Sequence, residues 1–572
     1  MTVSALSEQM VFPSGRSLTG NSRLLAVRSG LDSLWREFGA QCKDCIVFLS
    51  FSDMTSRARV LCATGQGPDE AWMNITAQLE AMYVRFNSET HLKIDLVTER
   101  YPITWKRLKE TLAVTKRNYF RFGIALDAEF KHAFLEQELN ANAMLYGGFN
   151  EEAAKLNESN FRFYFGQKYG NEFEPDFEND DGLQLFVTQG FYTSDGASLL
   201  RIEGKGLGAG HRVIDSIDIP VLDEMIKSGA QYLSSQLNDE GRFRYGWYPC
   251  FNREVHGYNT LRHASSTYSM VEVWEVFPDD EILNAIRKSF DWLVRECVKE
   301  IRQGGEESTS TVALLIDEGP EIKLGGNAVL LLALTKYSTL TGDDKYLELM
   351  EKLADGILLF QDSDTGEFVH VLHYPSLQLK EKFRIVYYDG EATFALSSYY
   401  RFSRKEKYLK AVERAFNWFE VNNYAKHRDH WIAYACEVMY DLTGDERYYR
   451  LALENIKGYL DFVAHRITAF PTLLEMMCAT ERLFESRDKK LSGTYTEVGK
   501  ENFRNAIEAR ARKLLHAYFW PELAMYYKVP ENVQGSFFIR HHSFRVRIDD
   551  VEHFLSAFTG YRKRLADKTF WM

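Results

Sequence analysis

Two carboxylates stand two residues apart in the stretch YYDGEA, directly before an apolar run with helical spacing. Near a helix start, Asp389 and Glu391 would lie in each other's field and in that of the helix dipole, which can separate their pKa values. One carboxyl group could protonate a leaving oxygen while a second, from the same stretch or at Asp429, activates water or attacks. We predict Glu391 as proton donor and Asp389 or Asp429 as base. The alternative is an N-cap followed by a first-turn acid.

Histidines occur in two comparable polar stretches, YNTLRH and HRDH. His263 and His430 could supply a proton donor and a proton acceptor on opposite sides of a sugar ring. A metal ion is the competing interpretation, since HRDH spaces two histidines by three residues and RHHSF adds two more. However, the chain has no HExxH motif, and no second C-x-x-C accompanies Cys42 and Cys45. We therefore predict no metal and no cofactor.

Further polar and aromatic residues belong to the same stretches. Arg262, Arg384 and Arg545 could bind a carboxylate or phosphate on the substrate in a bidentate way. The aromatic residues could form the stacking walls that sugar faces use. The predicted substrate-binding residues are Tyr245, Trp247, Tyr258, Asn259, Arg262, Asn327, Arg384, Tyr387, Tyr388, His427, Trp431, His542 and Arg545.

From about residue 218 onward, the hydrophobic pattern predicts helices in six pairs. One helix of each pair is amphipathic, and the other is apolar or small on nearly all sides. A helix that is apolar all round must be enclosed, so six of each in alternation predict a closed (α/α)6 toroid. An open helical solenoid is the alternative. The predicted outer helices are 219–236, 280–299, 345–360, 406–420, 446–463 and 501–517, and the predicted inner helices are 258–276, 326–340, 390–402, 430–442, 471–485 and 545–561.

In such a toroid all inner helices begin at one rim, so the polar residues at their starts converge on one cavity. The starts of the six inner helices hold the chain's densest mixtures of Tyr, Asn, Arg, His, Asp and Glu. Polar groups beside enclosed helices need partners or a ligand, because an unsatisfied one costs about 1–3 kcal/mol. The segment 366–384 interrupts the helical repeat and is predicted to cover the same rim.

The region before the toroid has a different pattern. Strand-like segments alternate with helix-like ones, for example CIVFLSF (45–51), LKIDLVT (92–98) and the helical 69–86. We predict a mixed α/β domain of unassigned role over residues 1–215 and the toroid, with the catalytic site, over 216–572. The fold class is thus multi-domain α+β.

Composition excludes several classes of function. The net charge of −12, with acidic residues spread along the chain, argues against nucleic acid or an anionic membrane surface as the main partner. The longest apolar run, 328–334, is far too short to span a membrane. The seven cysteines have no regular spacing, and the first 30 residues lack a signal-peptide pattern. These features predict a cytoplasmic protein.

The paired helices and the polar starts YYDGEA, YNTLRH and KHRDHW resemble the six-hairpin, (α/α)6-toroid class of carbohydrate-active proteins over roughly residues 218–572. That class includes glycosidases, unsaturated-uronyl hydrolases and N-acylglucosamine 2-epimerase-like isomerases. The resemblance is architectural and implies a sugar or oligosaccharide as partner, which could carry an acidic group. We predict hydrolysis of a glycosidic bond; a histidine-based isomerase or epimerase, or a protein that only binds a glycan or peptide, remain the alternatives.

Overall fold

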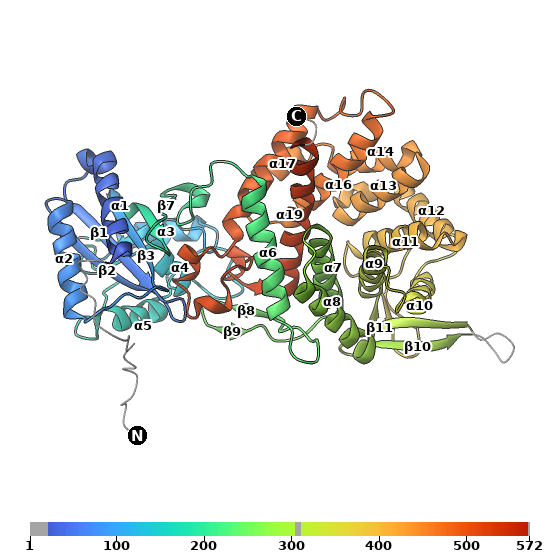
Figure 1. The fold of residues 1–572 in the computed structure, drawn as a ribbon, viewed down its shortest axis with the longest axis horizontal. Helices are drawn as coiled ribbons and strands as arrows, with labels where there is room; N and C mark the ends of the chain where they lie inside the picture. Colours follow the sequence, from blue (N-terminus) through green and yellow to red (C-terminus); the bar gives the residue numbers. More distant parts are fainter. Residues whose placement is uncertain (1–20, 304–309, 570–572) are drawn as a thin grey trace, which may run out of the picture.

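The N-terminal domain is built on an antiparallel sheet. In the computed structural model, which describes residues 21–303 and 310–569, its strands follow the order β2-β1-β3-β6-β4-β5, with β7 paired to β6 (Figure 1). The strands are β1 Cys45–Ser52, β2 Arg59–Gly65, β3 His91–Pro102, β4 Gly123–Ala125, β5 Ala133–Phe134, β6 Gln184–Thr193 and β7 Leu200–Ile202. Every pairing is antiparallel, so the predicted mixture of strands and helices takes an α+β form.

The two faces of this sheet have different neighbours. Val47 and Leu49 of β1 pack in one buried cluster with α1 and α2, whereas Ile46 and Phe48 belong to the core shared with the helical region. This alternation is the period of two that a strand imposes on its side chains. The helices of this domain are α1 Ser22–Phe38, α2 Pro68–Ala81, α3 Trp105–Val114, α4 Glu136–Ala141 and α5 Glu158–Tyr169.

The helical region is a closed ring of inner helices with a second layer outside it. Around the ring the inner helices contact one another in the order α7-α9-α11-α13-α16-α19, and α19 packs back against α7, which excludes an open solenoid. The inner helices are α7 Thr260–Val276, α9 Leu324–Thr341, α11 Tyr388–Ser403, α13 His430–Thr443, α16 Pro471–Asp488 and α19 Ile548–Thr569. The outer helices are α6 Ile219–Ser235, α8 Asp280–Trp292, α10 Leu347–Leu358, α12 Glu406–Val421, α14 Glu446–Ile456 and α17 Lys500–Leu514.

Two outer helices are shorter than the sequence predicts. The α-helix predicted over 280–299 ends at Trp292 and continues as a π-helical turn, Leu293–Cys297, whereas the helix predicted over 446–463 is broken by Gly458, whose positive φ of 69° lies in the left-handed region that glycine adopts without strain. A short helix, α15 Leu460–His465, follows the break. The predicted division at residues 215 and 216 falls between β7 and α6.

The helical region also contains a five-stranded sheet, so it is not built from helices alone. It has the order β10-β11-β12-β13-β14, and the β10–β11 hairpin projects from the toroid (Figure 1). Its strands are β10 Val298–Gln303, β11 Ser310–Asp317, β12 Glu321–Lys323, β13 Val371–His373 and β14 Leu379–Glu381. The segment 366–384, predicted to cover the rim, supplies the last two strands, and β12 leads directly into α9.

The connection between α17 and α19 crosses to the N-terminal domain. It contains the short helix α18 Pro521–Ala524 and joins the sheet by backbone and side-chain contacts. Met525 O accepts from Ala58 N at 2.7 Å, and Glu522 forms a bidentate pair with Arg212, both contacts at 2.8 Å. The Tyr526 hydroxyl lies 3.5 Å from Lys93 Nζ, which forms a buried ion pair with Asp95 in β3 of the sheet. The two regions therefore share one continuous buried core.

Within the described ranges, no helix combines the length and the apolarity that crossing a lipid bilayer requires. The seven cysteines are unpaired.

Candidate active site

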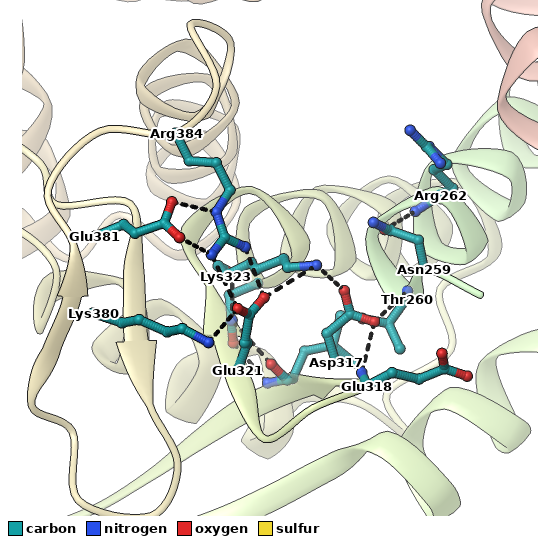
Figure 2. Close-up of polar contacts among 12 residues, drawn as sticks. Asn259, Thr260, Arg262, Asp317, Glu318, Glu321, Lys323, Lys380, Glu381 and Arg384 are labelled. Carbon is teal, nitrogen blue, oxygen red and sulfur yellow. Dashed lines mark hydrogen bonds and ion pairs between the residues drawn. The ribbon is translucent and has the colours of Figure 1, made fainter. Parts of the chain in front are cut away.

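The starts of three inner helices are tied together at one end of the ring. Arg262 in the first turn of α7 pairs with Asp549 in the first turn of α19, with Nε and Oδ2 2.9 Å apart. Asp317 at the end of β11 accepts from Thr260 N at 3.2 Å and pairs with Lys323, the residue before α9 (Figure 2). Thus α19, α7 and α9 begin at the same rim.

Glu391 lies in the first turn of α11 and is almost completely buried. Its carboxylate lies directly against Gly325 of α9, where a Cβ would overlap Oε2, and that oxygen has no hydrogen-bond partner among the described residues. Burial raises the pKa of Glu391 to about 8, although the charge of His553 on α19 opposes this. Glu391 is therefore mostly protonated at neutral pH. It is also close enough to His553, across the ring, for that charge to affect its pKa.

Asp389 is turned toward the segments that connect the helices. Its Oδ2 accepts from His370 Nε2 at 2.8 Å and from the Tyr424 hydroxyl at 3.0 Å. His370 can donate through Nε2 because its Nδ1 accepts the backbone N–H of Arg384 at 2.9 Å, which fixes the tautomer. Asp389 is two residues from Glu391, about 200° around the helix, so the two predicted catalytic carboxylates do not face the same space.

Asp429 and His430 stand at the start of α13. Asp429 is the N-cap, and its Oδ1 accepts from Trp431 N at 2.9 Å. Its Oδ2 lies against Gly390 and has no hydrogen-bond partner among the described residues. Burial raises the pKa of Asp429 well above its usual range. His430 is buried, and neither of its ring nitrogens has a hydrogen-bond partner in the described chain, although Asp429 Oδ1 is 3.6 Å from Nδ1. Burial, helped by the charge of His553, lowers the pKa of His430 far below its ordinary value. His430 is thus a neutral imidazole at pH 7.

His553 faces His430 from α19, with ring centroids 5.5 Å apart. Its Nδ1 lies 3.0 Å from Glu475 Oε1 on α16 and 3.4 Å from Glu552 Oε1. Burial alone would lower the pKa of His553, but the Glu552 and Glu475 carboxylates outweigh it and raise the pKa to about 10. His553 is therefore an imidazolium at neutral pH. The ring interior holds a neutral histidine beside a charged one.

The same residues include one candidate metal site. Ligand atoms of His430, Glu475 and His553 all lie within 4.8 Å of one another. Two imidazoles and a carboxylate are a donor set that zinc accepts. A histidine ligand must be deprotonated, however, and the two carboxylates beside His553 favour its protonated form. The arrangement fits a buried ion pair better than a metal centre.

His263 lies elsewhere, which corrects the predicted pairing with His430. Its Nδ1 bonds the Tyr258 hydroxyl and its Nε2 bonds Ser289 Oγ of the outer helix α8, both at 2.7 Å, and its ring stacks on Trp292. Burial lowers the pKa of His263 to about 3. Although His263 follows Arg262 in sequence, the turn of about 100° per residue points it at the outer layer. We read Tyr258 and His263 as packing residues.

Three predicted substrate-binding residues have structural partners instead. Asn259 is the N-cap of α7, and Asn327 bonds the backbone of β11 through Leu315 N at 2.7 Å. Arg384 is held between Glu321 and Glu381, at the edge of the five-stranded sheet (Figure 2). Both carboxylates raise the pKa of Arg384, and protein partners occupy this guanidinium and the Asn327 amide.

Another predicted group lies where α7 and α19 begin. Tyr245 accepts from Arg262, and Arg545 forms a buried bidentate pair with Asp550, at 2.9 and 2.8 Å. Trp247 is buried in β8 (Gly246–Tyr248), which with β9 (Arg253–Glu254) and β15 (Val546–Arg547) makes a small sheet. Arg545 and Trp247 therefore support the rim, while Arg262 remains partly exposed.

The remaining predicted residues divide between the interior and the outside. The rings of Tyr387 and Trp431 lie 5.2 and 4.9 Å from that of His430, and Tyr388 lies against Gly325. His427, in contrast, makes an edge-to-face contact with Tyr424 in the connection before α13, and His542 lies before α19. The structure thus brings Glu391, Asp429, His430, Tyr387, Tyr388 and Trp431 together and leaves His263, His427, Asn327 and Arg384 apart.

The sequence analysis missed His553, Glu475 and Glu552. All three lie on buried inner helices. Glu475 is the fifth residue of α16, and Glu552 and His553 are the fifth and sixth residues of α19, so they lie beyond the polar helix starts from which the site was predicted. Ionisable residues inside a helix that is otherwise enclosed need buried partners. That signal was present in LLEMM and VEHFL.

No protein-family model and no curated protein sequence matches the chain. Solved structures do match it. A cellobiose 2-epimerase from Bacillus thermoamylovorans is 10% identical, with a TM-score of 0.45, over 60% of this chain and 99% of its own. An alpha-1,6-mannanase from Salegentibacter is 12% identical with a TM-score of 0.42, over 60% and 99%. A D-mannose isomerase is 10% identical with a TM-score of 0.45, over 62% and 100%.

All three TM-scores are below 0.5 and all three identities are below 25%, so these similarities carry no argument about this chain. The chemistry of the site is therefore argued from this chain's own residues.

Proposed function

We propose that the protein is a carbohydrate-active enzyme that isomerises or epimerises a sugar, with His430 and His553 as the proton-transferring pair. The observation that carries this proposal is that two histidines face each other 5.5 Å apart, one without a hydrogen-bond partner among the described residues and the other beside Glu475 and Glu552. His430, whose pKa is lowered by burial, is a base, and His553, whose pKa is raised to about 10 by Glu552 and Glu475, is an acid. A pair of groups whose environments separate their pKa values suits acid–base catalysis.

The proton balance of the reaction needs no cofactor. In an open-chain sugar, His430 takes the proton from the carbon beside the carbonyl group. The electron pair of that C–H bond forms a carbon–carbon double bond, and the carbonyl oxygen becomes the oxyanion of an enediolate. His553 then returns a proton to carbon. Return to the same carbon from the other face gives an epimer, whereas return to the former carbonyl carbon, with the hydroxyl proton redistributed, gives an isomer.

Glu391 has a role in the same scheme. Because burial raises its pKa to about 8, the carboxyl group can donate a hydrogen bond to the oxyanion of the enediolate at neutral pH. Its Oε2 has no protein partner among the described residues, so binding a substrate oxygen would satisfy a buried polar atom. Glu391 thus keeps the proton-donating character predicted from sequence but acts on a different oxygen.

The substrate class follows from the surroundings of His430. Tyr387 and Trp431 place aromatic rings beside it, and Tyr434 donates to Glu475 at 3.3 Å close by. Aromatic rings next to buried hydrogen-bonding groups suit a sugar, which presents C–H faces and hydroxyl edges together. This supports a carbohydrate rather than a charged peptide.

Glycosidic hydrolysis is the second candidate, and the raised pKa of Glu391 favours it. A paired-carboxylate mechanism also needs an ionised partner. Asp429, the nearest candidate, has a pKa that burial raises as well, and Asp389 is bound to His370 and Tyr424. The structure provides an acid for hydrolysis without a free base, so we place isomerisation first.

One experiment tests both candidates. The wild-type protein is incubated with a panel of aldoses and ketoses in deuterated water, and deuterium at carbon is followed by proton NMR, while release of reducing ends from oligosaccharides is measured in parallel. We expect exchange at the carbon beside the carbonyl group with at least one sugar, and its loss in His430→Phe. Release of reducing ends without carbon exchange would establish hydrolysis instead. Sugar binding with neither reaction would leave a binding protein.

A further inference from the structure

The junction between the N-terminal domain and the toroid rim collects positive charge. Lys116 and Arg117 come from the N-terminal domain, Arg466 from the connection before α16, and His541 and His542 from the connection before α19. We call Lys116, Arg117 and Arg466 the junction cations, and the two histidines lie beside them. Arg117 Nε donates to His541 O at 2.6 Å, which joins the two regions directly, and the rings of His541 and His542 lie 4.3 Å apart.

The junction cations are not neutralised by the protein. Arg117 Nη1 donates to the carbonyl groups of Gly148 and Phe149, at 3.0 and 2.9 Å. Arg466 bonds the Thr468 hydroxyl at 2.8 Å. In residues 21–303 and 310–569, no ion pair with a carboxylate is found for Lys116, Arg117 or Arg466. A chain with a net charge of −12 thus leaves three cations uncompensated at one place.

The two histidines record the same field. Burial, together with the charges of His542, Lys116, Arg117 and Arg466, lowers the pKa of His541 to about 3. Burial and the nearby arginines lower the pKa of His542 to about 4, and Asp550 only partly offsets them. Each ring has an Nδ1 without a hydrogen-bond partner in the described chain. Neutral imidazoles can donate one hydrogen bond to an anion without adding charge.

The junction lies beside the proposed active site. His542 interacts with Arg545 and Asp550, and Asp550 is in the first turn of α19, one turn before His553. Arg466 precedes α16, the helix that carries Glu475. Since both inner helices begin here, a substrate at the mouth of the ring can extend toward the junction cations.

We propose that the junction cations bind an anionic group, a phosphate or a carboxylate, on the sugar that reaches His430 and His553. This inference rests on the proposed function for the identity of the sugar site, and it adds the substrate class: an acidic sugar rather than a neutral one. Charge, hydrogen-bond donors and partial exposure at one place are what recognition of such a group requires. The N-terminal domain thereby contributes Lys116 and Arg117 to substrate selection.

The test compares binding of three sugars that differ in the group at carbon 6 and hence in charge. Isothermal titration calorimetry measures glucose, glucose 6-phosphate and glucuronate, together with inorganic phosphate, against the wild-type protein at 20 and 300 mM salt. We expect at least one of the acidic sugars to bind about 10-fold or more tightly than glucose, with the difference shrinking at high salt because screening weakens exposed charge pairs. Preference for glucose 6-phosphate or for glucuronate identifies the phosphate or the carboxylate as the group bound.

Two variants and a control locate the effect. Arg466→Gln should reduce the preference for the acidic sugar about 5-fold, and the double variant Lys116→Gln/Arg466→Gln should reduce it further. Arg504→Gln, on the exposed face of α17, is the control and should leave the preference unchanged. Melting temperatures check that each variant is folded. Equal affinity for the three sugars, absence of binding by every anion, or a preference that survives the double variant would overturn the proposal.

The outcome is separable from that of the proposed function. Binding is measured without turnover, so an anion preference with no carbon exchange in deuterated water would reject the isomerase alone. Carbon exchange on a neutral sugar with no anion preference would reject the junction site alone.

Discussion

His430 and His553 face each other inside the ring of inner helices, with ring centroids 5.5 Å apart and ring planes at 75°. One has two ring nitrogens without a hydrogen-bond partner among the described residues, and the other is bonded to Glu475 at 3.0 Å. Their environments therefore differ although they are neighbours. That difference lowers the pKa of His430 far below its ordinary value and raises that of His553 to about 10.

The first prediction compares the same substitution at two buried histidines. His430→Phe should reduce carbon exchange about 100-fold or more and leave stability nearly unchanged, because no hydrogen bond of the protein is lost. His263→Phe should do the reverse. It removes the His263 partner of the Tyr258 and Ser289 hydroxyls, which keep their bonds to Phe243 N and Thr267 Oγ1, at a cost of about 1–3 kcal/mol, but keeps activity per folded molecule.

Urea unfolding and an active-site titration measure the two effects separately. The assignment would fail if His263→Phe lost exchange activity while His430→Phe retained it.

The second prediction concerns Glu391 and pH. The pKa of Glu391 is raised by burial from 4.5 to about 8, so between these values the folded state holds a proton that the unfolded state has released. The free energy of unfolding should fall with rising pH through this window, by about 1.4 kcal/mol per pH unit from this group. Glu391→Gln carries no such proton and should remove that slope.

Urea titrations at pH 5, 6, 7 and 8 measure the slope, with Glu413→Gln on the exposed face of α12 as control. An unchanged slope in Glu391→Gln would show that the carboxyl group is ionised in the folded protein.

Periodicity accounts for how much of the toroid could be predicted. Inner helices such as α9 are buried on nearly every side. Over its 18 residues, one or two exceptions do not change the apolar pattern that predicts an enclosed helix. The strands β12, β13 and β14 span three residues each and have no periodicity to detect. β12 is stabilised by pairing with β13, which lies about 50 residues further along the chain. A local sequence pattern contains no information about such a distant partner.

The candidate site was predictable only where its residues stand at helix starts. Glu391, Asp429 and His430 were found because a polar stretch precedes an apolar helix. His553 and Glu475 were missed since each depends on the other helix for its partner. His263 was misplaced because its sequence neighbour Arg262 does face the rim, and one residue changes the direction of a helical side chain by about 100°.

The third prediction uses two adjacent glycines of α9. A Cβ at Gly325 would overlap Glu391 Oε2 and approach Tyr388 and Leu261 to 2.6 and 2.8 Å, whereas a Cβ at Gly326 meets nothing nearer than Leu315 Cδ2 at 3.4 Å. Both substitutions to alanine gain about 1 kcal/mol of helix propensity. Gly326→Ala should therefore be neutral or stabilising, and Gly325→Ala should displace Glu391 and lower exchange activity.

Activity and melting temperature of the two variants provide the measurement, each serving as control for the other. Equal behaviour of the pair would mean that the Glu391 side chain does not lie against α9.

The last prediction concerns Glu475 as a positioning residue for His553. Glu475→Gln keeps an oxygen that can accept from His553 Nδ1 but removes one of the carboxylates that raise the pKa of His553 from 6.5 to about 10. A histidine with a raised folded pKa stabilises fully below about pH 6.5 and loses that contribution as pH rises through 10. In Glu475→Gln this loss should be complete at a lower pH, and the alkaline limb of the pH–rate profile should shift to lower pH with it.

The matched control is Glu437→Gln on α13, which removes the partner of Arg482. It should change neither the pH dependence of stability nor the alkaline limb. Unfolding and exchange rates from pH 6 to 10 test this, and a reduced rate with an unshifted alkaline limb would indicate that Glu475 only packs against His553.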